Sequence, residues 1–325
     1  MPKPDLSILI VTYNSACLIG PLLKRLRDER ELVRAEVIVV DNASSDGTAD
    51  RIACEHPWVR LILSARNLGF AAGNNLAARH ATGRCLLLLN PDAEPAPGAL
   101  ARGVELMDSH PQVGLSGGEL RGVDGSRQPS ARMFPKLRDE LFTLSGLAAR
   151  FPQSRLFARL DRRWADPEQA AQVDWIPGAF VFIRPALFSQ LGGFDERFFM
   201  YYEEVDFCRR VVATGHKVQY WPELKVAHVG GASVRTVRRA RVSSAGAQLE
   251  IWRMRSALLY YRKHHGPVAA AALHGIERGW YRLRALKAKL ARRPAAATDF
   301  GLHIQQVRQA WCDTRGGTLS PARPW

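Results

Sequence analysis

Four short hydrophobic segments divide the first ninety residues of the chain. They are rich in branched side chains and occupy Leu6–Val11, Glu36–Val40, Val59–Leu63 and Cys85–Leu89. Continuous hydrophobic runs of this length are typical of strands covered on both faces of a sheet. They recur roughly every 25 to 30 residues, the spacing of β-strand–helix–β-strand units. The pattern predicts an α/β fold with a parallel sheet and helices on both faces. The helix-like stretches between the runs lie at Leu18–Arg30, Ala49–Glu55 and Ala71–Ala81.

Each hydrophobic segment is followed at once by a cluster of polar residues. The clusters are Thr12–Ser15, Asp41–Thr48, Asn67–Gly69 and Asn90–Glu94. Open α/β sheets bind their ligands outside the carboxyl ends of the strands, which is where these clusters fall. The sequence therefore predicts a ligand site along one edge of the sheet.

The pattern becomes weaker in the middle of the chain. Residues Pro95–Ala171 read as helices and loops, and a second ordered block, Val173–His228, contains strand-like pieces near Trp175–Ile183 and Val218–Trp221. From Arg235 to Pro294 the chain is helical and amphipathic in pattern, and the glycines and prolines of the last stretch predict a loose end.

The length and composition indicate a globular α/β protein with an extension. A chain of 325 residues suits one large domain plus an appendage, and 46% hydrophobic and 24% charged residues exclude a disordered chain. No apolar run approaches the ~20 residues of a membrane-spanning helix, and the N-terminus lacks the apolar stretch of a signal peptide. The protein is therefore expected in the cytoplasm. Five cysteines without a Cys-x-x-Cys pair favour neither a disulfide framework nor a zinc site.

The positive charge is concentrated near the C-terminus. Residues 235–293 contain 15 lysines and arginines against two acids, and so carry +13 of the net charge of +15. A basic amphipathic helix with aromatic side chains is typical of contact with an anionic membrane surface, at about 1 kcal/mol per basic side chain, although a solvated helix face would look the same. We expect peripheral membrane contact. The aromatic residues of this stretch include Trp252, Tyr260, Tyr261, Trp280 and Tyr281.

Two of the polar clusters carry acids suited to binding a nucleotide diphosphate. Asp41 could accept hydrogen bonds from a base or a ribose, although the cluster also reads as a capped turn before a helix. Asp92 could hold a divalent cation, because a cation that bridges a diphosphate needs only one or two oxygen ligands from the protein. A solvated turn is the alternative. The glycines of Asn67–Asn75 do not form the dinucleotide-binding fingerprint, which disfavours hydride transfer.

A further set of acids lies among aromatic residues in the second ordered block. Adjacent carboxylates such as Glu203 and Glu204 beside apolar rings can have raised pKa values, as a general base for a sugar hydroxyl requires. Acids also suit the N-terminus of the helix that is expected to follow, which is the structural alternative. His228 follows a strand-like stretch. A lone histidine is usually structural, and a role in metal binding is favoured only by the presence of the other motifs.

Taken together and in order, these motifs resemble one enzyme family. The motifs are Val11–Ser15, Val40–Thr48, Asn67–Asn74, Asn90-Pro91-Asp92, Gly192–Asp195, Tyr202–Asp206 and His228. The set closely resembles family 2 glycosyltransferases of the GT-A fold, and in particular the rhamnosyltransferase-like branch that builds bacterial surface polysaccharides. The resemblance covers Leu6–Ser233. It implies a catalytic domain over residues 1–234, with a nucleotide-sugar half at about 1–95 and an acceptor half at about 172–234, followed by a basic tail at 235–325.

The resemblance also implies roles for individual residues. It places a divalent metal, Mg²⁺ or Mn²⁺, on Asp92 with His228 completing the site, and makes Glu204 the general base, with Glu203 or Asp206 able to share this work. Two departures are Asn90, at the first acid of the family's Asp-x-Asp motif, and Glu204, where an aspartate is usual. The residues implied to bind the nucleotide-sugar are Thr12, Tyr13, Asp41, Asn67, Gly69, Asn74 and Asn90.

The implied reaction is the inverting, metal-dependent transfer of a sugar from a nucleotide donor, with dTDP-rhamnose the first choice, to a glycan or lipid-linked acceptor. Such a hexosyltransferase would be peripheral on the inner face of the cytoplasmic membrane. One alternative is a sugar nucleotidyltransferase, but Val11–Ser15 lacks the glycines and basic residues that hold a triphosphate. Another is a basic nucleic-acid- or membrane-binding protein with an inactive catalytic domain. No nucleic-acid-binding motif accompanies the charge, and so no nucleic-acid partner is expected.

Overall fold

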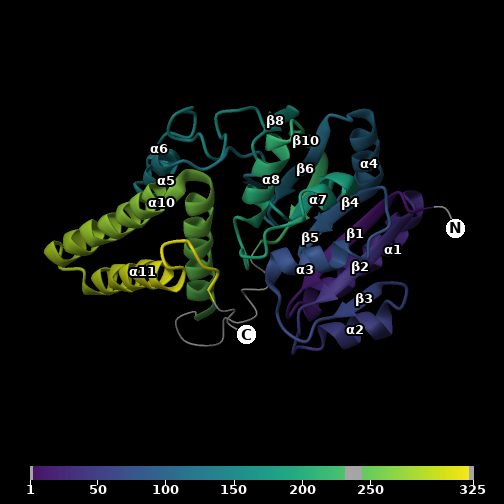
Figure 1. Cartoon of the computed structure of the whole chain (residues 1–325), viewed down its shortest axis with the longest axis horizontal. Helices are drawn as coiled ribbons and strands as arrows, with labels where there is room; N and C mark the ends of the chain where they lie inside the picture. The colour runs from purple at the N-terminus through teal and green to yellow at the C-terminus, as the bar shows by residue number, and fades with distance from the viewer. Residues whose placement is uncertain (1–2, 231–243, 322–325) are drawn as a thin grey trace.

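The computed structural model describes residues 3–230 and 244–321, which form a mixed sheet, its flanking helices and a C-terminal helical extension (Figure 1). Four parallel strands lie in the order β3-β2-β1-β4, as the spacing of the hydrophobic runs predicts. Their bounds are β1 Leu6–Thr12, β2 Ala35–Asp41, β3 Arg60–Leu63 and β4 Cys85–Leu89. The helices between them are α1 Ala16–Leu32, α2 Thr48–Glu55 and α3 Gly69–Ala78. The predicted α/β fold is confirmed.

Beyond β4 the sheet continues in the order β9-β6-β10-β5 with mixed directions. β9 pairs antiparallel with both β4 and β6, whereas β6 and β10 are parallel. The bounds are β5 Ala93–Pro95, β6 Val113–Arg121, β7 Arg127–Gln128, β8 Ala171–Val173, β9 Phe180–Ile183 and β10 Lys217–His228. The antiparallel pairing of β5 with β10 brings the end of β10 to the turn that follows β4.

The long strand β6 lies in the region that the sequence pattern left as helices and loops. Its sequence contains three glycines, which are poor strand formers, but the packing requires them. A Cβ atom on Gly118 would lie 1.9 Å from the carbonyl oxygen of Leu224, and one on Gly117 would lie 2.4 Å from Ile176. Close tertiary contacts therefore stabilise this strand, although the β-propensity of its own residues is low.

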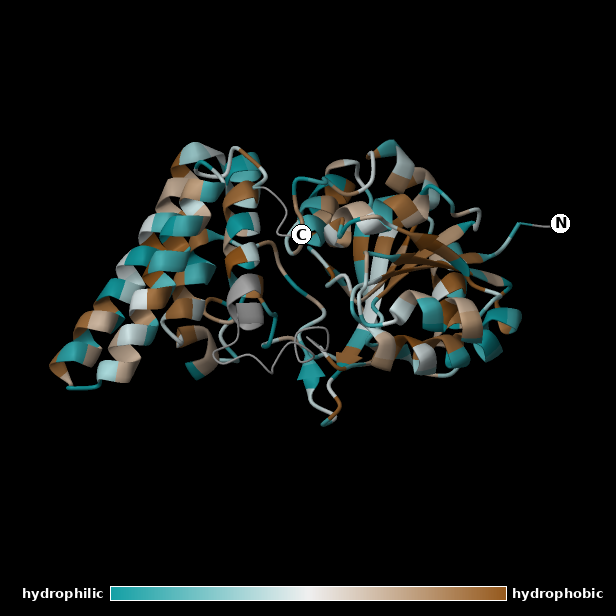
Figure 2. Ribbon diagram, turned by 90° about the horizontal axis from the view of Figure 1, so that it is seen from below, coloured by the Kyte–Doolittle hydropathy of each residue, from teal (hydrophilic) through white to brown (hydrophobic). Residues whose placement is uncertain are grey.

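Helices cover both faces of the sheet, and two hydrophobic clusters separate them. Leu9 and Leu88 belong to the cluster beneath α3 and the helices at Pro185–Gln190, Glu203–Ala213 and Ser244–Leu290, whereas Ile8 and Leu87 belong to the one beneath α1, α2 and the helix at Ala99–Ser109. Neighbouring residues of one strand thus face opposite clusters, which explains the continuous apolar runs. Figure 2 shows these strands in brown between the helices. The remaining helices of this part are α4 Ala99–Ser109, α5 Leu137–Leu144, α6 Leu147–Arg150, α7 Pro185–Gln190 and α8 Glu203–Ala213.

The C-terminal extension consists of α10 (Ser244–Leu290) and α11 (Pro294–Asp313), which pack side by side (Figure 1). α10 changes direction at Gly266, whose φ of 84° lies in the left-handed region. The predicted helical extension is confirmed. The prediction of a loose end after Pro294 is wrong, because the apolar positions of α11, Val307 and Ala310, are buried in the hydrophobic cluster that also contains α10.

The first half of α10 packs against α5, against the segment that precedes α8 and against the first turn of α8. Trp252, Tyr260 and Tyr261, which the sequence analysis assigns to a membrane-facing helix, are at most 2% exposed here. The predicted domain boundary between residues 234 and 235 lies outside the described residues. Within residues 3–230 and 244–321, no helix is long and apolar enough to cross a membrane.

Candidate active site

The first two strands end in a contact between two of the predicted nucleotide-binding residues. Thr12 and Asp41 are partners in the parallel register of β1 and β2, and Thr12 Oγ1 donates a hydrogen bond of 3.1 Å to Asp41 Oδ1. Ser44 donates two more bonds to the Asp41 carboxylate, from its backbone N–H (2.9 Å) and its hydroxyl (2.6 Å). Asp41 is thereby fixed at the sheet edge, and the buried Thr12 helps to hold it. Tyr13 follows at the same edge and is half-buried.

The loop before α3 is held in place by buried side-chain amides. The backbone N–H of Gly69 donates to Asn67 Oδ1 at 2.9 Å, and Asn42 Nδ2 donates to the carbonyl oxygen of Gly69 at 3.1 Å. Gly69 has a φ of 80°, and a Cβ atom there would lie 2.2 Å from the carbonyl oxygen of Phe199. Only glycine fits this position. Asn67 thus shapes the loop beside Asp41.

The helix α3 connects this loop to the segment that precedes α8. Asn75 exchanges two hydrogen bonds with the backbone of Phe194, at 2.8 and 2.9 Å, and the N–H of Phe70 donates to the carbonyl oxygen of Phe199 at 2.8 Å. Asn74, one of the predicted binding residues, is buried and donates its Nδ2 to the carbonyl oxygen of Phe70 at 2.9 Å. The two halves of the site are therefore joined by direct contacts.

The structure brings Asp92 and His228 together, as a shared metal ion requires. His228 Nε2 lies 3.4 Å from Asp92 Oδ1, and the N–H of Val229 donates to the carbonyl oxygen of Asp92 at 3.0 Å. Asn90 opens the same turn, with a half-buried side chain and its backbone N–H bonded to the carbonyl oxygen of Ala179.

A third residue, Gln128 of β7, orients the imidazole of His228. Gln128 Nε2 donates to the carbonyl oxygen of His228 at 2.8 Å, which leaves Gln128 Oε1 as the acceptor for the N–H of His228 Nδ1 at 2.7 Å. The Nε2 lone pair of the neutral ring is therefore directed toward Asp92. Such an outer contact is what metal-binding histidines usually have.

This arrangement fits a divalent cation bound jointly by protein and ligand. One carboxylate oxygen and one imidazole nitrogen supply two ligands. Among residues 3–230 and 244–321 there is no cluster of three or more histidine, cysteine, aspartate or glutamate side chains that could hold a metal alone. The remaining ligands would come from a diphosphate and water, which is the usual arrangement for Mg²⁺.

The adjacent acids Glu203 and Glu204 form the first turn of α8, after a strained stretch of backbone. Tyr201 and Tyr202 have φ values of 68° and 67°. Each such non-glycine residue costs of the order of 1–3 kcal/mol, and strain of this kind is concentrated at functional sites. The strained turn places both carboxyl groups at the positive end of the helix.

The two carboxyl groups have different surroundings. Burial raises the pKa of both, and the nearby charge of Glu204 raises the pKa of Glu203 further. The positive charge of Arg132 and a hydrogen bond from Glu203 act in the opposite direction on the pKa of Glu204. The shared proton therefore belongs on Glu203, and Glu204 ionises first. Glu204 also lines a cavity of about 230 Å³, where a substrate hydroxyl could reach it.

Asp206, the third acid of this motif, is used in ion pairs. It lies 2.9 Å from Arg210 of its own helix and 2.6 Å from both Lys263 and His264 of α10. Burial alone would raise its pKa, but the hydrogen bonds from His264 and Lys263 more than offset this, and the pKa is lowered. Asp206 thus joins α8 to the extension.

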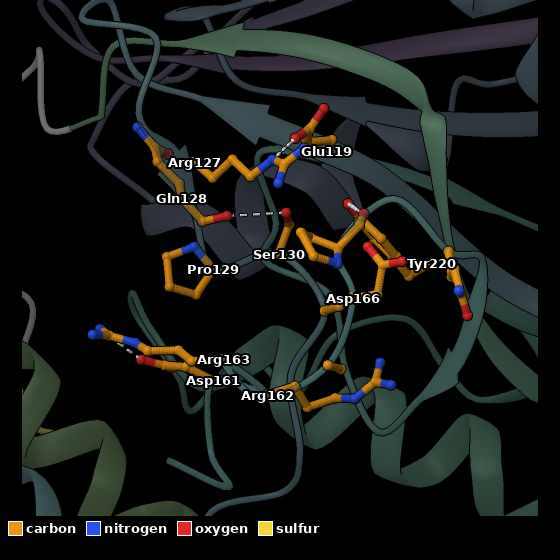
Figure 3. Close-up of a pocket in the computed structure, with 14 residues that line it drawn as sticks. Glu119, Arg127, Gln128, Pro129, Ser130, Asp161, Arg162, Arg163, Asp166 and Tyr220 are labelled. Carbon is orange, nitrogen blue, oxygen red and sulfur yellow. Dashed lines mark hydrogen bonds and ion pairs between the residues drawn. The ribbon is translucent and has the colours of Figure 1, made fainter. Parts of the chain in front are cut away.

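Gln128 also lines a second cavity, of about 400 Å³ (Figure 3). Two of the arginines in this cavity already have acidic partners: Arg127 bonds to Glu119, and Arg163 lies 3.2 Å from Asp161. No sequence motif pointed to Gln128, because it lies in a two-residue strand within the poorly patterned region.

Comparisons with known proteins support a single family. The family model "Glycosyl transferase family 2" matches residues 7–160. An N-acetylglucosaminyl-diphospho-decaprenol L-rhamnosyltransferase of Mycobacterium tuberculosis is 30% identical over 69% of this chain and 75% of its own length. The rhamnosyltransferase WbbL of Escherichia coli is 27% identical over 68% of this chain and 82% of its own.

A solved structure shares the fold. The mannosyltransferase PcManGT from Pyrobaculum calidifontis, in complex with GDP-Man and Mn²⁺, superposes with a TM-score of 0.53 at 20% identity, covering 97% of this chain and 88% of the other.

Proposed function

Because the chain belongs to glycosyl transferase family 2 and is a glycosyltransferase that uses a nucleotide-sugar donor, we propose that it transfers L-rhamnose from dTDP-rhamnose with inversion. Two of its relatives are named as rhamnosyltransferases, and the name of one specifies a sugar linked through a diphosphate to a polyprenol. We propose an acceptor of the same class, a sugar on a polyprenyl diphosphate.

The donor nucleotide would lie at the edge formed by β1 and β2. Asp41 is held by three hydrogen bonds from Thr12 and Ser44, and so its carboxylate is ready to accept hydrogen bonds from the base or ribose. Tyr13 lies beside it with an aromatic ring suited to stacking on a base. Asn67 and Gly69 support this edge from the neighbouring loop.

The contact between Asp92 and His228 is the observation that carries the proposed metal dependence. A divalent cation held by these two residues would neutralise the charge that develops on the leaving diphosphate. Gln128 holds His228 in the tautomer that the site needs, and the antiparallel pairing of β5 with β10 keeps both ligands on rigid strands.

Glu204 would act on the acceptor. Its carboxylate takes the proton of the acceptor hydroxyl while the oxygen forms a bond to the anomeric carbon, and the bond from that carbon to the diphosphate breaks in the same step. The nucleoside diphosphate leaves from the opposite face of the sugar, so a β-linked donor gives an α-linked product. Glu203 retains its own proton, which it donates to Glu204 in a hydrogen bond that favours the ionised base.

We also propose that the tip of the α10–α11 hairpin contacts the inner face of an anionic membrane. Leu283, Leu286 and Leu290 are 58%, 55% and 78% exposed and share one face of α10 by their spacing. Exposed basic residues surround them: Arg282, Arg284, Lys287, Lys289, Arg292 and Arg293. Apolar side chains among basic ones suit the boundary between acyl chains and anionic headgroups. Figure 2 shows mixed hydrophobic and hydrophilic segments along this hairpin.

The direct test is turnover of a panel of UDP-, GDP- and dTDP-sugars by the purified protein, with and without Mg²⁺ or Mn²⁺. We expect metal-dependent turnover of dTDP-rhamnose that is lost in Asp92→Ala and Glu204→Gln. Preference for another donor would refute the assignment of the sugar while leaving the class intact. Release of pyrophosphate from dTTP and rhamnose 1-phosphate would instead support a nucleotidyltransferase.

A further inference from the structure

The cavity that contains Glu204 is lined by charged groups from four separate parts of the chain. Arg132 lies after β7, Glu140 is in α5, Glu204 begins α8, and Arg253 comes from the C-terminal helix α10. The cavity volume of about 230 Å³ is below the roughly 300–1,000 Å³ of pockets for drug-sized ligands. It therefore suits one portion of a larger acceptor, the part next to the reacting hydroxyl.

Both arginines in this cavity have N–H groups available. Arg132 is fixed by its bond to Asp161 and by stacking at 4.4 Å on the ring of Trp175, yet its Nε–H is buried without a hydrogen-bond partner. Arg253 is half-buried, and among the described residues no hydrogen bond or ion pair to its guanidinium is found. The buried Nε–H of Arg132 is costly without an acceptor, which indicates that a ligand supplies one.

The carboxyl groups of Glu140, Glu250 and Glu277 lie near Arg253, but among the described residues none of them forms an ion pair with it. Glu140 accepts hydrogen bonds from Tyr202 at 3.2 Å and from Tyr261 at 3.4 Å. Burial raises the pKa of Glu140, and it raises that of Glu277 to about 7, so that the negative charge of Glu277 is incomplete near neutral pH. This contrasts with Arg127 and Arg163 in the neighbouring cavity of Figure 3, each of which contacts an acid directly.

We propose that Arg132 and Arg253 bind a phosphate group of the acceptor, adjacent to the hydroxyl that Glu204 deprotonates. Planar guanidinium groups match phosphate oxygens in geometry and charge. The inference rests on the proposed function and extends it: the C-terminal helix α10 is part of the acceptor site, and the enzyme selects acceptors whose first sugar carries a phosphate ester. The phosphate belongs either to a lipid diphosphate or to a free sugar phosphate.

The test compares three acceptors with the full-length protein and dTDP-rhamnose: N-acetylglucosamine joined through a diphosphate to an undecyl chain, N-acetylglucosamine 1-phosphate, and the uncharged undecyl glycoside of N-acetylglucosamine. For the wild type we expect kcat/KM to be at least ~10-fold higher for the charged lipid than for the uncharged one. If N-acetylglucosamine 1-phosphate is also used efficiently, the site recognises a phosphate group alone. If it is not used while the charged lipid is used well, the site recognises a lipid diphosphate.

In Arg253→Gln the ratio of kcat/KM for the charged lipid to that for the uncharged glycoside should fall roughly 10- to 100-fold. The fall should come mainly from a higher KM for the charged lipid, while turnover of the uncharged glycoside changes little. Arg253→Lys should retain part of the advantage. Arg255→Gln is the matched control, because Arg255 lies on the same helix but pairs with Asp313. If Arg253→Gln does not fold, as judged by circular dichroism, Arg132→Gln tests the same point from another segment. Because Arg132 also lowers the pKa of Glu204, this variant is judged by the ratio of kcat/KM for the charged lipid to that for the uncharged glycoside.

Two outcomes would overturn the proposal. If Arg253→Gln and Arg132→Gln slow transfer to charged and uncharged acceptors equally, the arginines do not recognise phosphate, although the glycosyltransferase assignment stands. If the wild type releases nucleotide from no sugar donor in any arm, the proposed function fails, and this inference fails with it.

Discussion

The contact between Gln128 and His228 allows a quantitative prediction about metal binding. Gln128→Leu preserves much of the side-chain volume but removes both the acceptor for His228 Nδ1–H and the donor to the His228 carbonyl oxygen. Two neutral hydrogen bonds are worth about 1–3 kcal/mol together. Without them the imidazole is no longer held in one tautomer and orientation before the metal arrives, and this ordering must occur on binding. Loss of such outer contacts typically weakens metal binding about 10- to 100-fold, in agreement with that range.

The assay is titration of Mn²⁺ in the presence of saturating dTDP, followed by electron paramagnetic resonance, because the diphosphate is expected to complete the ligand set. It reports affinity directly and requires no turnover. Gln169→Leu is the matched control, because Gln169 is exposed and lines the same cavity of about 400 Å³ as Gln128 but makes no hydrogen bond to His228. If the Gln128→Leu variant folds normally and binds Mn²⁺ as tightly as the wild type, the role assigned to Gln128 is refuted.

Three other properties follow from the same structure. Because burial raises the pKa of Glu204 and Arg132 lowers it, kcat/KM should rise with pH above the usual range for glutamate, and Arg132→Met should move this rise to still higher pH; a profile unchanged in the variant would contradict the pairing. Asp206→Asn should destabilise the fold by about 3–5 kcal/mol in urea unfolding, since it leaves Lys263 and His264 without their buried partner. The folded-state pKa of Asp206 is lowered, so the lost stability is present above about pH 4 and disappears as pH falls through that lowered pKa, and a pH-independent difference would exclude this origin. Replacing Leu283, Leu286 and Leu290 by serine should reduce binding to vesicles containing anionic lipid at least ~10-fold without changing turnover of water-soluble acceptors; equal retention would place the membrane contact elsewhere.

The parts of the fold that could be predicted are those where local pattern and tertiary packing agree. The buried parallel strands produce continuous apolar runs, and their polar ends mark the ligand edge, so the contact of Thr12 with Asp41 and that of Asp92 with His228 lie where the pattern indicated. β6 was missed because its glycines satisfy contacts with distant segments that the local sequence does not reveal.

The C-terminal helices show the opposite problem. Hydrophobic periodicity predicts that α10 is helical, but it does not say what covers each face. The aromatic residues Trp252 and Tyr260 proved to be core residues that pack on Phe199 and Tyr202, and the exposed leucines lie further along the helix. Arg253 and Gln128 could not be found for a related reason: each is a single residue without a motif, and only the folded chain places it beside Glu204 or His228.

The central claim is that Glu204 and the Asp92–His228 pair carry out an inverting sugar transfer. The most direct measurement is a nuclear magnetic resonance assay of transfer from dTDP-β-L-rhamnose to N-acetylglucosamine diphosphate undecyl ester in the presence of Mg²⁺, with the wild type and Glu204→Gln. We predict an α-linked rhamnoside from the wild type, no product after chelation of the metal, and loss of transfer in Glu204→Gln with donor binding retained. A β-linked product, or a Glu204→Gln variant as active as the wild type, would contradict the account.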